Sequence, residues 1–225
     1  MPDKFVEFQY KLDELPFKEK FKLLKKAIKE NPNEPWYYWM LASTYSLKED
    51  GKNAIKNYEK SIEMDSKFAA GHASLARFLT DYDSTQLNNA LMHINKAISI
   101  EPKTDNFYID RANVYLKKKE YDLAIKNANI ALNFPDPNYY PAYEVIVNAL
   151  YAQKKQSELT AFLKKTDMSK GYYGTDFAML LGNLYEKMKD YEKACNCYRM
   201  AAEPYEMMEE KIPANIELKL KNCKQ

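Results

Sequence analysis

The sequence predicts an all-α fold in which antiparallel helix pairs stack into a solenoid. One two-helix pattern returns six times along the 225 residues, at an interval of roughly 35. Matching positions carry the same residue types: Ala42, Ala112 and Gly182, then Tyr45, Tyr115 and Tyr185, then Ala54, Ala124 and Ala194. Glycine is scarce, at 5 residues, as a helical chain requires. A fixed period in this range is typical of repeat arrays, so we expect a single domain over residues 1–225.

Each predicted repeat is one helix pair. The six repeats span about 1–34, 35–68, 69–104, 105–138, 139–174 and 175–208. In the first, Pro16 begins the second helix, which ends before Asn31 and Pro32. In the second, Gly51 is expected to open the turn between the helices. The third is two residues longer, and we place the excess in the inter-helix segment 81–86, since insertions in a solenoid go to loops.

The remaining repeats keep the same pattern. The fourth is the most regular, the fifth replaces small residues by Val147 and Leu159, and the sixth returns to form. Beyond it, Ile212, Ile216 and Leu220 recur at four-residue spacing. This spacing predicts a terminal helix over about 209–223 that caps the last exposed apolar face.

Two pairs of segments carry a family resemblance: 108–115 with 120–124, and 181–185 with 190–194. In these segments and at the recurring positions the chain resembles the tetratricopeptide repeats, a helix–turn–helix family with a 34-residue unit. The resemblance implies a right-handed superhelix whose concave groove is lined by the first helix of each repeat. It also implies a non-enzymatic adaptor or scaffold that binds a peptide or helix of a partner protein, without indicating which partner.

The groove predicted from this resemblance presents residues opposite the buried stripe of each first helix. They are Trp36, Trp39, Met40, Arg77, Asp110, Asn113, Glu144, Asn148, Tyr151, Met179 and Asn183. The tryptophans with Met40 suggest an aromatic pocket, since Trp and Tyr dominate interface energies; alternatively, both tryptophans pack against the first repeat. The three asparagines recur at a fixed spacing and could hold the backbone of an extended peptide, although asparagine is also common at this site in the family.

The clamp by which some members of the family bind heat-shock chaperone tails needs lysine, asparagine and arginine at fixed groove positions. Aligned from the second repeat, those positions hold Trp39, Ser43, Ser74, Asn106 and Asp110. We therefore expect no heat-shock carboxylate clamp. Acidic and basic side chains also mix along the predicted groove, which disfavours a strongly charged ligand there.

Composition narrows the other classes of function. A net charge of +2 argues against nucleic-acid binding, and no apolar window is long enough to span a membrane. The N-terminal segment lacks the apolar core of a signal peptide, so a cytoplasmic location is expected. Cys195, Cys197 and Cys223 are expected to be reduced thiols without a metal or disulfide role.

Nothing in the sequence indicates catalysis. His72 and His93 stand in no nucleophile-and-base arrangement, and no phosphate loop or dinucleotide motif occurs. We expect no enzyme, no cofactor and no metal. The leading function is capture of a partner peptide or helix; the alternatives are a self-assembling structural homo-oligomer and a chaperone-like binder of an apolar client segment.

Overall fold

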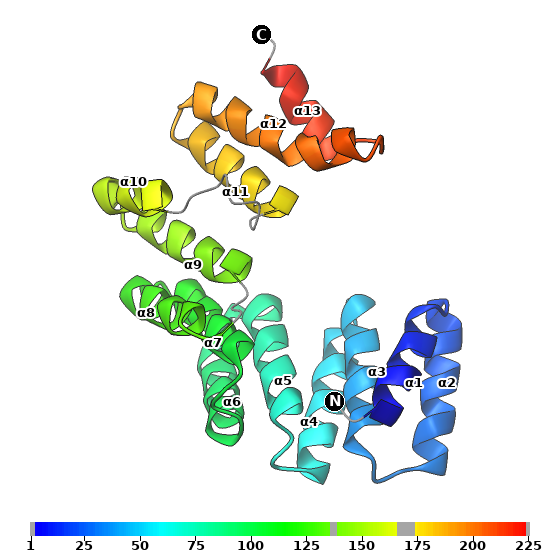
Figure 1. Cartoon of the computed structure of the whole chain (residues 1–225). Helices are drawn as coiled ribbons and strands as arrows, with labels where there is room; N and C mark the ends of the chain where they lie inside the picture. The colour runs from blue at the N-terminus through cyan, green and yellow to red at the C-terminus, as the bar shows by residue number, and fades with distance from the viewer. Residues whose placement is uncertain (1–2, 136–138, 166–173, 224–225) are drawn as a thin grey trace. The chain divides into compact units, whose positions relative to one another are not determined.

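The computed structural model describes residues 3–135, 139–165 and 174–223 (Figure 1). Every regular element in these ranges is a helix, and the helices follow one another as antiparallel pairs. The prediction of an all-α fold of stacked helix pairs is therefore confirmed. The expected junction after residue 138 and the last residues of the fifth repeat fall in 136–138 and 166–173, outside the described residues.

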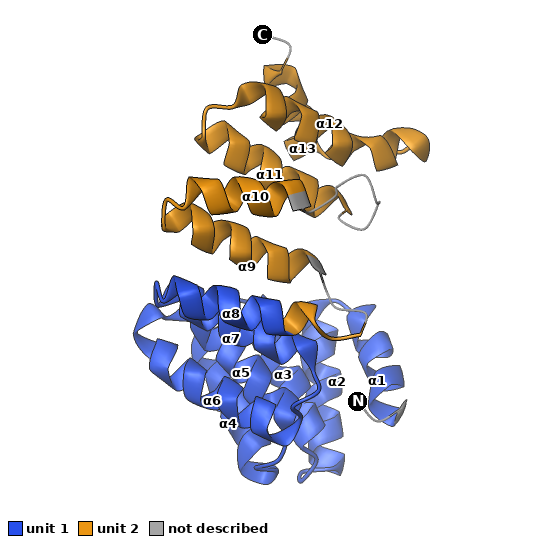
Figure 2. Cartoon of the chain, turned by 60° about the vertical axis from the view of Figure 1, so that its left-hand side comes forward, with its two compact units in different colours: residues 1–130 blue, residues 131–225 orange. Residues whose placement is uncertain are grey.

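The chain divides into two compact units, residues 1–130 and 131–225 (Figure 2). The helices of the first unit are α1 (Asp3–Asp13), α2 (Phe17–Glu30), α3 (Pro35–Leu47), α4 (Gly51–Met64), α5 (Ala69–Tyr82), α6 (Leu87–Ile100), α7 (Asp105–Lys117) and α8 (Tyr121–Leu132), whose last two residues are counted with the second unit. A 3₁₀ turn, η1 (Ser84–Gln86), lies between α5 and α6, where the longer third repeat was expected to hold its extra residues.

The second unit contains α9 (Tyr139–Ala152), α10 (Gln156–Lys165), α11 (Gly174–Lys187), α12 (Tyr191–Met207) and α13 (Ala214–Asn222). Small residues let its helices approach closely. A Cβ built on Gly182 of α11 would lie 2.3 Å from the ring of Tyr198 on α12, and Tyr198 is itself 2% exposed. In the first unit Ala42 and Ala54 are likewise fully buried where α3 meets α4. The recurring small residues of the sequence are thus the places where the helices of a pair cross.

In the described residues the turns inside four helix pairs and the turn between α12 and α13 share one backbone geometry. Each contains a non-glycine residue with positive φ: Glu49, Lys119, Lys154, Lys189 and Glu209. After each of them a backbone N–H returns to a carbonyl of the preceding helix, as from Asp50 to Tyr45 at 3.0 Å. This is the bond that closes a Schellman-type helix end. The expectation that Gly51 opens the turn is wrong, because Gly51 is the first residue of α4 and Glu49 makes the left-handed step.

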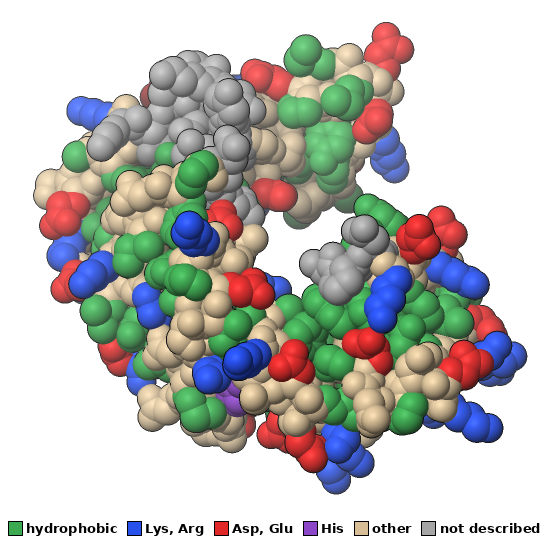
Figure 3. Space-filling view, turned by 60° about the horizontal axis from the view of Figure 1, so that its bottom comes forward, with side chains coloured by type: hydrophobic (Ala, Val, Ile, Leu, Met, Phe, Trp, Pro, Cys, Tyr) green, Lys and Arg blue, Asp and Glu red, His purple; other side chains and the backbone are tan. Residues whose placement is uncertain are grey.

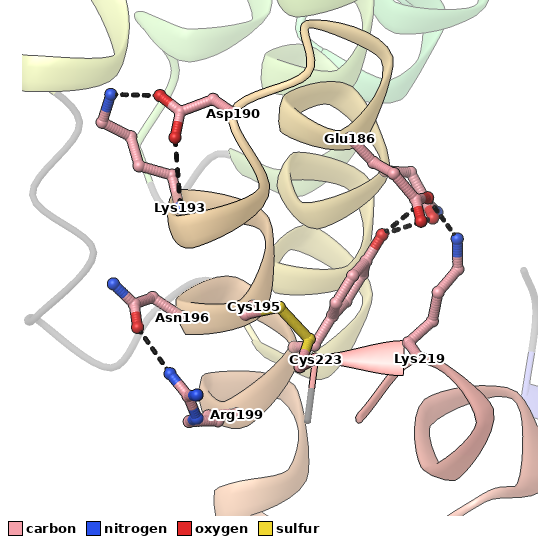
Figure 4. Close-up of a disulfide and its surroundings, with 10 residues drawn as sticks. Glu186, Asp190, Lys193, Cys195, Asn196, Arg199, Lys219 and Cys223 are labelled. Atoms are coloured by element: carbon pink, nitrogen blue, oxygen red, sulfur yellow. Dashed lines mark hydrogen bonds and ion pairs between the residues drawn. A yellow bond between two sulfur atoms is a disulfide. The ribbon is translucent and has the colours of Figure 1, made fainter. Parts of the chain in front are cut away.

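The terminal helix α13 covers the apolar face left by α11 and α12. Ile216 is fully buried among Ala178, Ala201 and Ala202, so the predicted capping helix is confirmed. A disulfide joins Cys195 of α12 to Cys223, just after α13 (Figure 4). The expectation of three reduced thiols is therefore wrong for this pair: α13 folds back along α12 and brings the two Cα atoms to 5.6 Å, within the range for a disulfide.

Cys197, two residues along the same helix, points to the core instead. It is a free and buried thiol, and burial raises its pKa to about 11. The thiolate is therefore absent at neutral pH, which leaves this cysteine as a small apolar core residue.

Candidate functional site

A pocket of about 910 Å³ opens on the first unit between α3, α4 and α5. It is called the groove pocket below. Its lining residues are Trp39, Ser43, Ser46, Leu47, Glu49, Tyr58, Ser74, Arg77, Phe78, Asp81 and Tyr82. Leu47 is 69% exposed and Tyr82 53% exposed, so two large apolar side chains stand open to solvent beside it. Exposed aromatic and aliphatic side chains around a concave surface are typical of protein-binding sites.

The wall of the groove pocket is fixed by hydrogen bonds between helices. The indole N–H of Trp39 donates to the hydroxyl of Ser74 at 2.8 Å, which ties α3 to α5. The hydroxyls of Ser43 and Tyr58 lie 3.1 Å apart and tie α3 to α4. Burial raises the pKa of Tyr58, so its hydroxyl stays protonated at neutral pH. The polar atoms of these four side chains thus hold the aromatic surfaces in place.

The charges in and beside the groove pocket are balanced by a further helix. Arg77 binds Asp110 of α7 through two parallel bonds, from Nε at 2.9 Å and from Nη2 at 2.8 Å. Asp110 is 7% exposed, and burial raises the pKa of its carboxyl against the lowering effect of Arg77. Asp81 is also paired with α7, since its Oδ1 lies 3.5 Å from Nζ of Lys117. Both signs are therefore present and paired, and acidic and basic side chains are also interspersed on the face in Figure 3.

The structure separates the residues predicted for the aromatic end of the groove. Trp39 lines the groove pocket, whereas Trp36 stacks on Phe5 with ring centroids 5.6 Å apart and meets Phe68 edge-on at 4.5 Å. Met40 is 1% exposed in the core beneath, so its expected place on the groove face is wrong. Trp36 therefore packs against the first repeat, as the alternative expected. Trp39 packs on the same core cluster and also lines the groove pocket.

Of the other predicted residues, only Arg77 lines this pocket. Asp110 is buried behind Arg77, while Asn113 of α7 is half-buried and does not line the pocket. The members on the second unit, none of which lines it, are Glu144, Asn148, Tyr151, Met179 and Asn183. Asn183 accepts a hydrogen bond from the Tyr198 hydroxyl at 3.1 Å, so its side chain supports α12. Burial, and then the charge of Asp176, raises the pKa of Glu144.

Sequence reasoning missed most of the apolar wall. Leu47, Phe78 and Tyr82 were not assigned to the groove, although they continue the helical spacing that begins at Trp39 and Ser74. The signal was present in the spacing of three and four residues along the last turns of both helices. The predicted groove ended at Met40 on the first of these helices and at Arg77 on the second, so it stopped short of these side chains.

Within the described residues no group of three or more His, Cys, Asp or Glu side chains is placed to hold a metal ion. In the same ranges no helix combines the length and apolar character that crossing a membrane requires. The groove pocket is thus the principal candidate in the described part of the chain.

Comparison with known proteins identifies the repeat. The profile of a tetratricopeptide repeat family matches residues 37–68 and 175–203, which hold most of α3 with α4 and most of α11 with α12. These two segments of the chain are therefore tetratricopeptide repeats. Over 107 residues it is 35% identical to small glutamine-rich tetratricopeptide repeat-containing protein 2 of Saccharomyces cerevisiae, an alignment that covers 47% of this chain and 28% of that protein.

A second tetratricopeptide repeat relative is the TPR repeat-containing thioredoxin TDX of Arabidopsis thaliana. It is 39% identical over 49 residues, which are 22% of this chain and 13% of that protein. The chain thus matches less than a third of the length of either relative.

Solved structures show the same fold. The widely conserved type IV pilus biogenesis factor PilW matches with a TM-score of 0.73 at 12% identity, covering 98% of this chain and 94% of that one. A tetratricopeptide repeat protein from Parabacteroides merdae gives 0.70 at 14% identity, covering 97% and 80%. Yeast Tom70 gives 0.65 at 18% identity, covering 83% and 39%. At these identities the likeness concerns the fold alone.

Proposed function

We propose that the chain is a non-enzymatic adaptor that binds a short segment of another protein in the groove pocket. Members of its family generally act as protein-interaction modules. The observation that carries the proposal is the pocket of about 910 Å³, in which Trp39, Phe78 and Tyr82 form an aromatic wall beside the exposed Leu47. Burying such side chains against a partner supplies the main favourable term of binding.

The lining also indicates the chemistry of the bound segment. One apolar or aromatic side chain of the partner would insert against Trp39 and Phe78, while the hydroxyls of Ser43 and Ser46 offer hydrogen bonds to its backbone. Because Arg77 and Asp81 are already paired with α7, the segment needs no strong charge of its own. A dissociation constant of about 1 µM, or roughly 8 kcal/mol, is expected for a contact of this kind.

The test uses exposed residues of the pocket, because the buried ones also hold the fold. The double variant Leu47→Glu with Tyr82→Ala changes the wall without touching the core. Met92→Glu with Tyr191→Ala is the matched control, since Met92 and Tyr191 are 57% and 61% exposed and line no part of the groove pocket. Each protein is used to select binding peptides from a random peptide display library, and the affinities are then measured by calorimetry.

The wild type and the control should both select peptides with an apolar anchor. These peptides should bind the pocket variant at least tenfold more weakly than they bind the wild type. Equal affinity for all three proteins would show that binding lies elsewhere. Selection of no peptide by the wild type would refute peptide capture itself.

The disulfide bears on where the adaptor works. Disulfides persist in oxidising compartments and are rare in the reducing cytoplasm. The Cys195–Cys223 bond therefore favours an oxidising compartment over the expected cytoplasmic location. Thiol labelling of the protein in extracts prepared without reductant, from cells of its source, decides between them: a bonded pair supports the former and two labelled cysteines the latter.

A further inference from the structure

The helix α2 carries an excess of positive charge. Its lysines are Lys18, Lys20, Lys22, Lys25, Lys26 and Lys29, and its acidic residues are Glu19 and Glu30. Three of the lysines, Lys18, Lys22 and Lys25, line a surface pocket of about 500 Å³ together with Phe21 and Tyr45. This basic pocket shares no residue with the groove pocket. Its chemistry is also different, because it combines one sign of charge with an aromatic floor.

The three lysines form one row on the helix. Steps of four and three residues keep them on one face, about 6 Å and 4.5 Å apart along the axis. All three are exposed, and in the described residues none of them is within 4.0 Å of an acidic group. Their charge is therefore not neutralised by the fold.

The floor of the basic pocket is formed by two rings. Phe21 of α2 and Tyr45 of α3 lie with ring centroids 4.8 Å apart, and both are half-buried. At the N-terminal end of α2, Lys48 lies 5.3 Å and Lys20 5.8 Å from the ring of Phe17, which adds positive charge beside the row. An aromatic floor under a row of ammonium groups is complementary to a ligand that is anionic along its edge and apolar at one point.

We propose that the basic pocket binds an acidic segment of a partner protein that bears one aromatic or aliphatic side chain. In an extended chain, alternate residues lie roughly 6–7 Å apart on one side. Two carboxylates four residues apart on that side are therefore about 13 Å from each other, close to the roughly 10.5 Å along the helix axis from Lys18 to Lys25. The apolar side chain midway between them, on the same side, reaches Phe21 and Tyr45. This surface would add a second contact to the groove pocket, at a different place on the first unit.

Two other anionic occupants fit the structure less well. A bilayer would need the apolar side of α2, but Leu24 and Ala27 on that side are buried in the core. A nucleic acid would need a long basic track, whereas the chain has a net charge of +2 and this pocket contains no arginine. Both occupants are therefore included in the experiment as alternative ligands.

The probe is a fluorescein-labelled peptide of sequence Glu-Glu-Phe-Glu-Glu, followed by fluorescence anisotropy at low salt. The glutamine form of the same peptide measures the contribution of charge. The variant is Lys22→Glu with Lys25→Glu. The control is Lys26→Glu with Lys56→Glu, which changes the net charge equally at exposed lysines that line neither pocket. Circular dichroism confirms that both variants are folded.

The pocket variant should bind the acidic peptide at least tenfold more weakly than the control variant does. The glutamine peptide should bind none of the proteins. An equal loss of affinity in both variants would mean that the peptide responds to the overall positive charge of the protein and not to the basic pocket, and would overturn the proposal. Absence of binding by the wild type would also overturn it. Tighter binding of single-stranded oligothymidine or of vesicles with 20% phosphatidylserine than of the peptide would also overturn it. Leu47→Glu with Tyr82→Ala should leave this affinity unchanged, so the two proposals fail separately.

Discussion

The imidazoles of His72 and His93 face each other across α5 and α6 with their Nδ1 atoms 3.0 Å apart. The ring centroids are 5.3 Å apart, and the ring planes are inclined to each other by 34°. Nε2 of His72 lies 3.3 Å from the carbonyl oxygen of Ser66, and a carbonyl only accepts. Nε2 of His72 therefore carries the proton, and Nδ1–H of His93 donates to His72. Only one proton fits between the two rings.

Stability should therefore fall at mildly acidic pH. Burial, and to a lesser extent the charge of His72, lowers the pKa of His93 to about 4. Burial also lowers the pKa of His72; Lys96 adds to this effect, whereas the hydrogen bond to Ser66 and the charge of Asp65 oppose it. An unfolded histidine titrates near 6.5, so between pH 6.5 and 4 the unfolded chain binds more protons. The contribution of the two histidines to the free energy of unfolding is fully present above pH 6.5. It should decrease by about 1–2 kcal/mol toward pH 4, allowing for solvent screening.

Melting temperatures measured by circular dichroism from pH 7.5 to 5 check this, above the range in which most carboxylates titrate. The variant His93→Gln removes one titrating ring and should flatten the curve. A variant whose melting temperature falls as steeply as that of the wild type would show that the pair is not responsible.

The Arg77–Asp110 pair predicts a strong coupling between α5 and α7. Arg77→Met leaves the carboxylate of Asp110 buried without a partner and should lower the free energy of unfolding by about 2–3 kcal/mol. Asp110→Leu should be destabilising by less. The double variant should be no worse than Arg77→Met alone, and urea denaturation of all four proteins measures the coupling. Strictly additive losses would mean that the pair contributes nothing as a pair.

The positive φ of 63° at Lys119 predicts that glycine is better there. Left-handed backbone costs a residue with a Cβ about 1–2 kcal/mol, and glycine returns part of this as entropy of the unfolded chain. Lys119→Gly should therefore stabilise the protein by about 0.5–1 kcal/mol in urea denaturation. Lys126→Gly, at an exposed position inside α8, should destabilise it by about 1 kcal/mol. Destabilisation by both changes would contradict the described turn.

Two glycines predict opposite responses to alanine. At Gly182 the added Cβ meets the ring of Tyr198, which is fully buried and hydrogen-bonded to Asn183, so Gly182→Ala should cost about 1–3 kcal/mol. At Gly51 it meets the far end of Tyr82, which is half exposed and free to swing aside. Gly51→Ala should change the melting temperature little and alter the groove pocket instead. Equal losses in thermal unfolding would disprove the distinction.

The disulfide predicts a measurable contribution from α13. It closes a loop with a sequence separation of 28, for which the chain-entropy account gives about 3–4 kcal/mol. Cys223→Ser should lower the melting temperature of the oxidised protein, and a reducing agent should lower that of the wild type to the same value. The variant itself should be insensitive to reductant. An unchanged wild type under reduction would indicate that Cys195 and Cys223 are not joined in solution.

The period of the repeat made the helix pairs predictable, because Ala42, Ala54 and their equivalents stand wherever two helices cross. The site was less predictable. The disulfide was missed because Cys195 was compared with its neighbour Cys197, whereas the pairing depends on how α13 folds back. Trp36 and Met40 were placed on the surface because spacing alone cannot show that α1 lies over Trp36 and supplies Phe5. Contacts between distant segments decide such cases, and a local pattern does not contain them.

The chain has just two tryptophans, and Trp39 forms part of the groove pocket while Trp36 lies against it with ring centroids 5.6 Å apart. When the tryptophans are excited selectively over the 19 tyrosines, the emission of the protein therefore originates at this one place. A segment that enters the pocket changes the polarity around the Trp39 indole and shifts that emission without any label. The molecule thus carries its own optical reporter, and partners could be screened by spectroscopy on the unmodified chain.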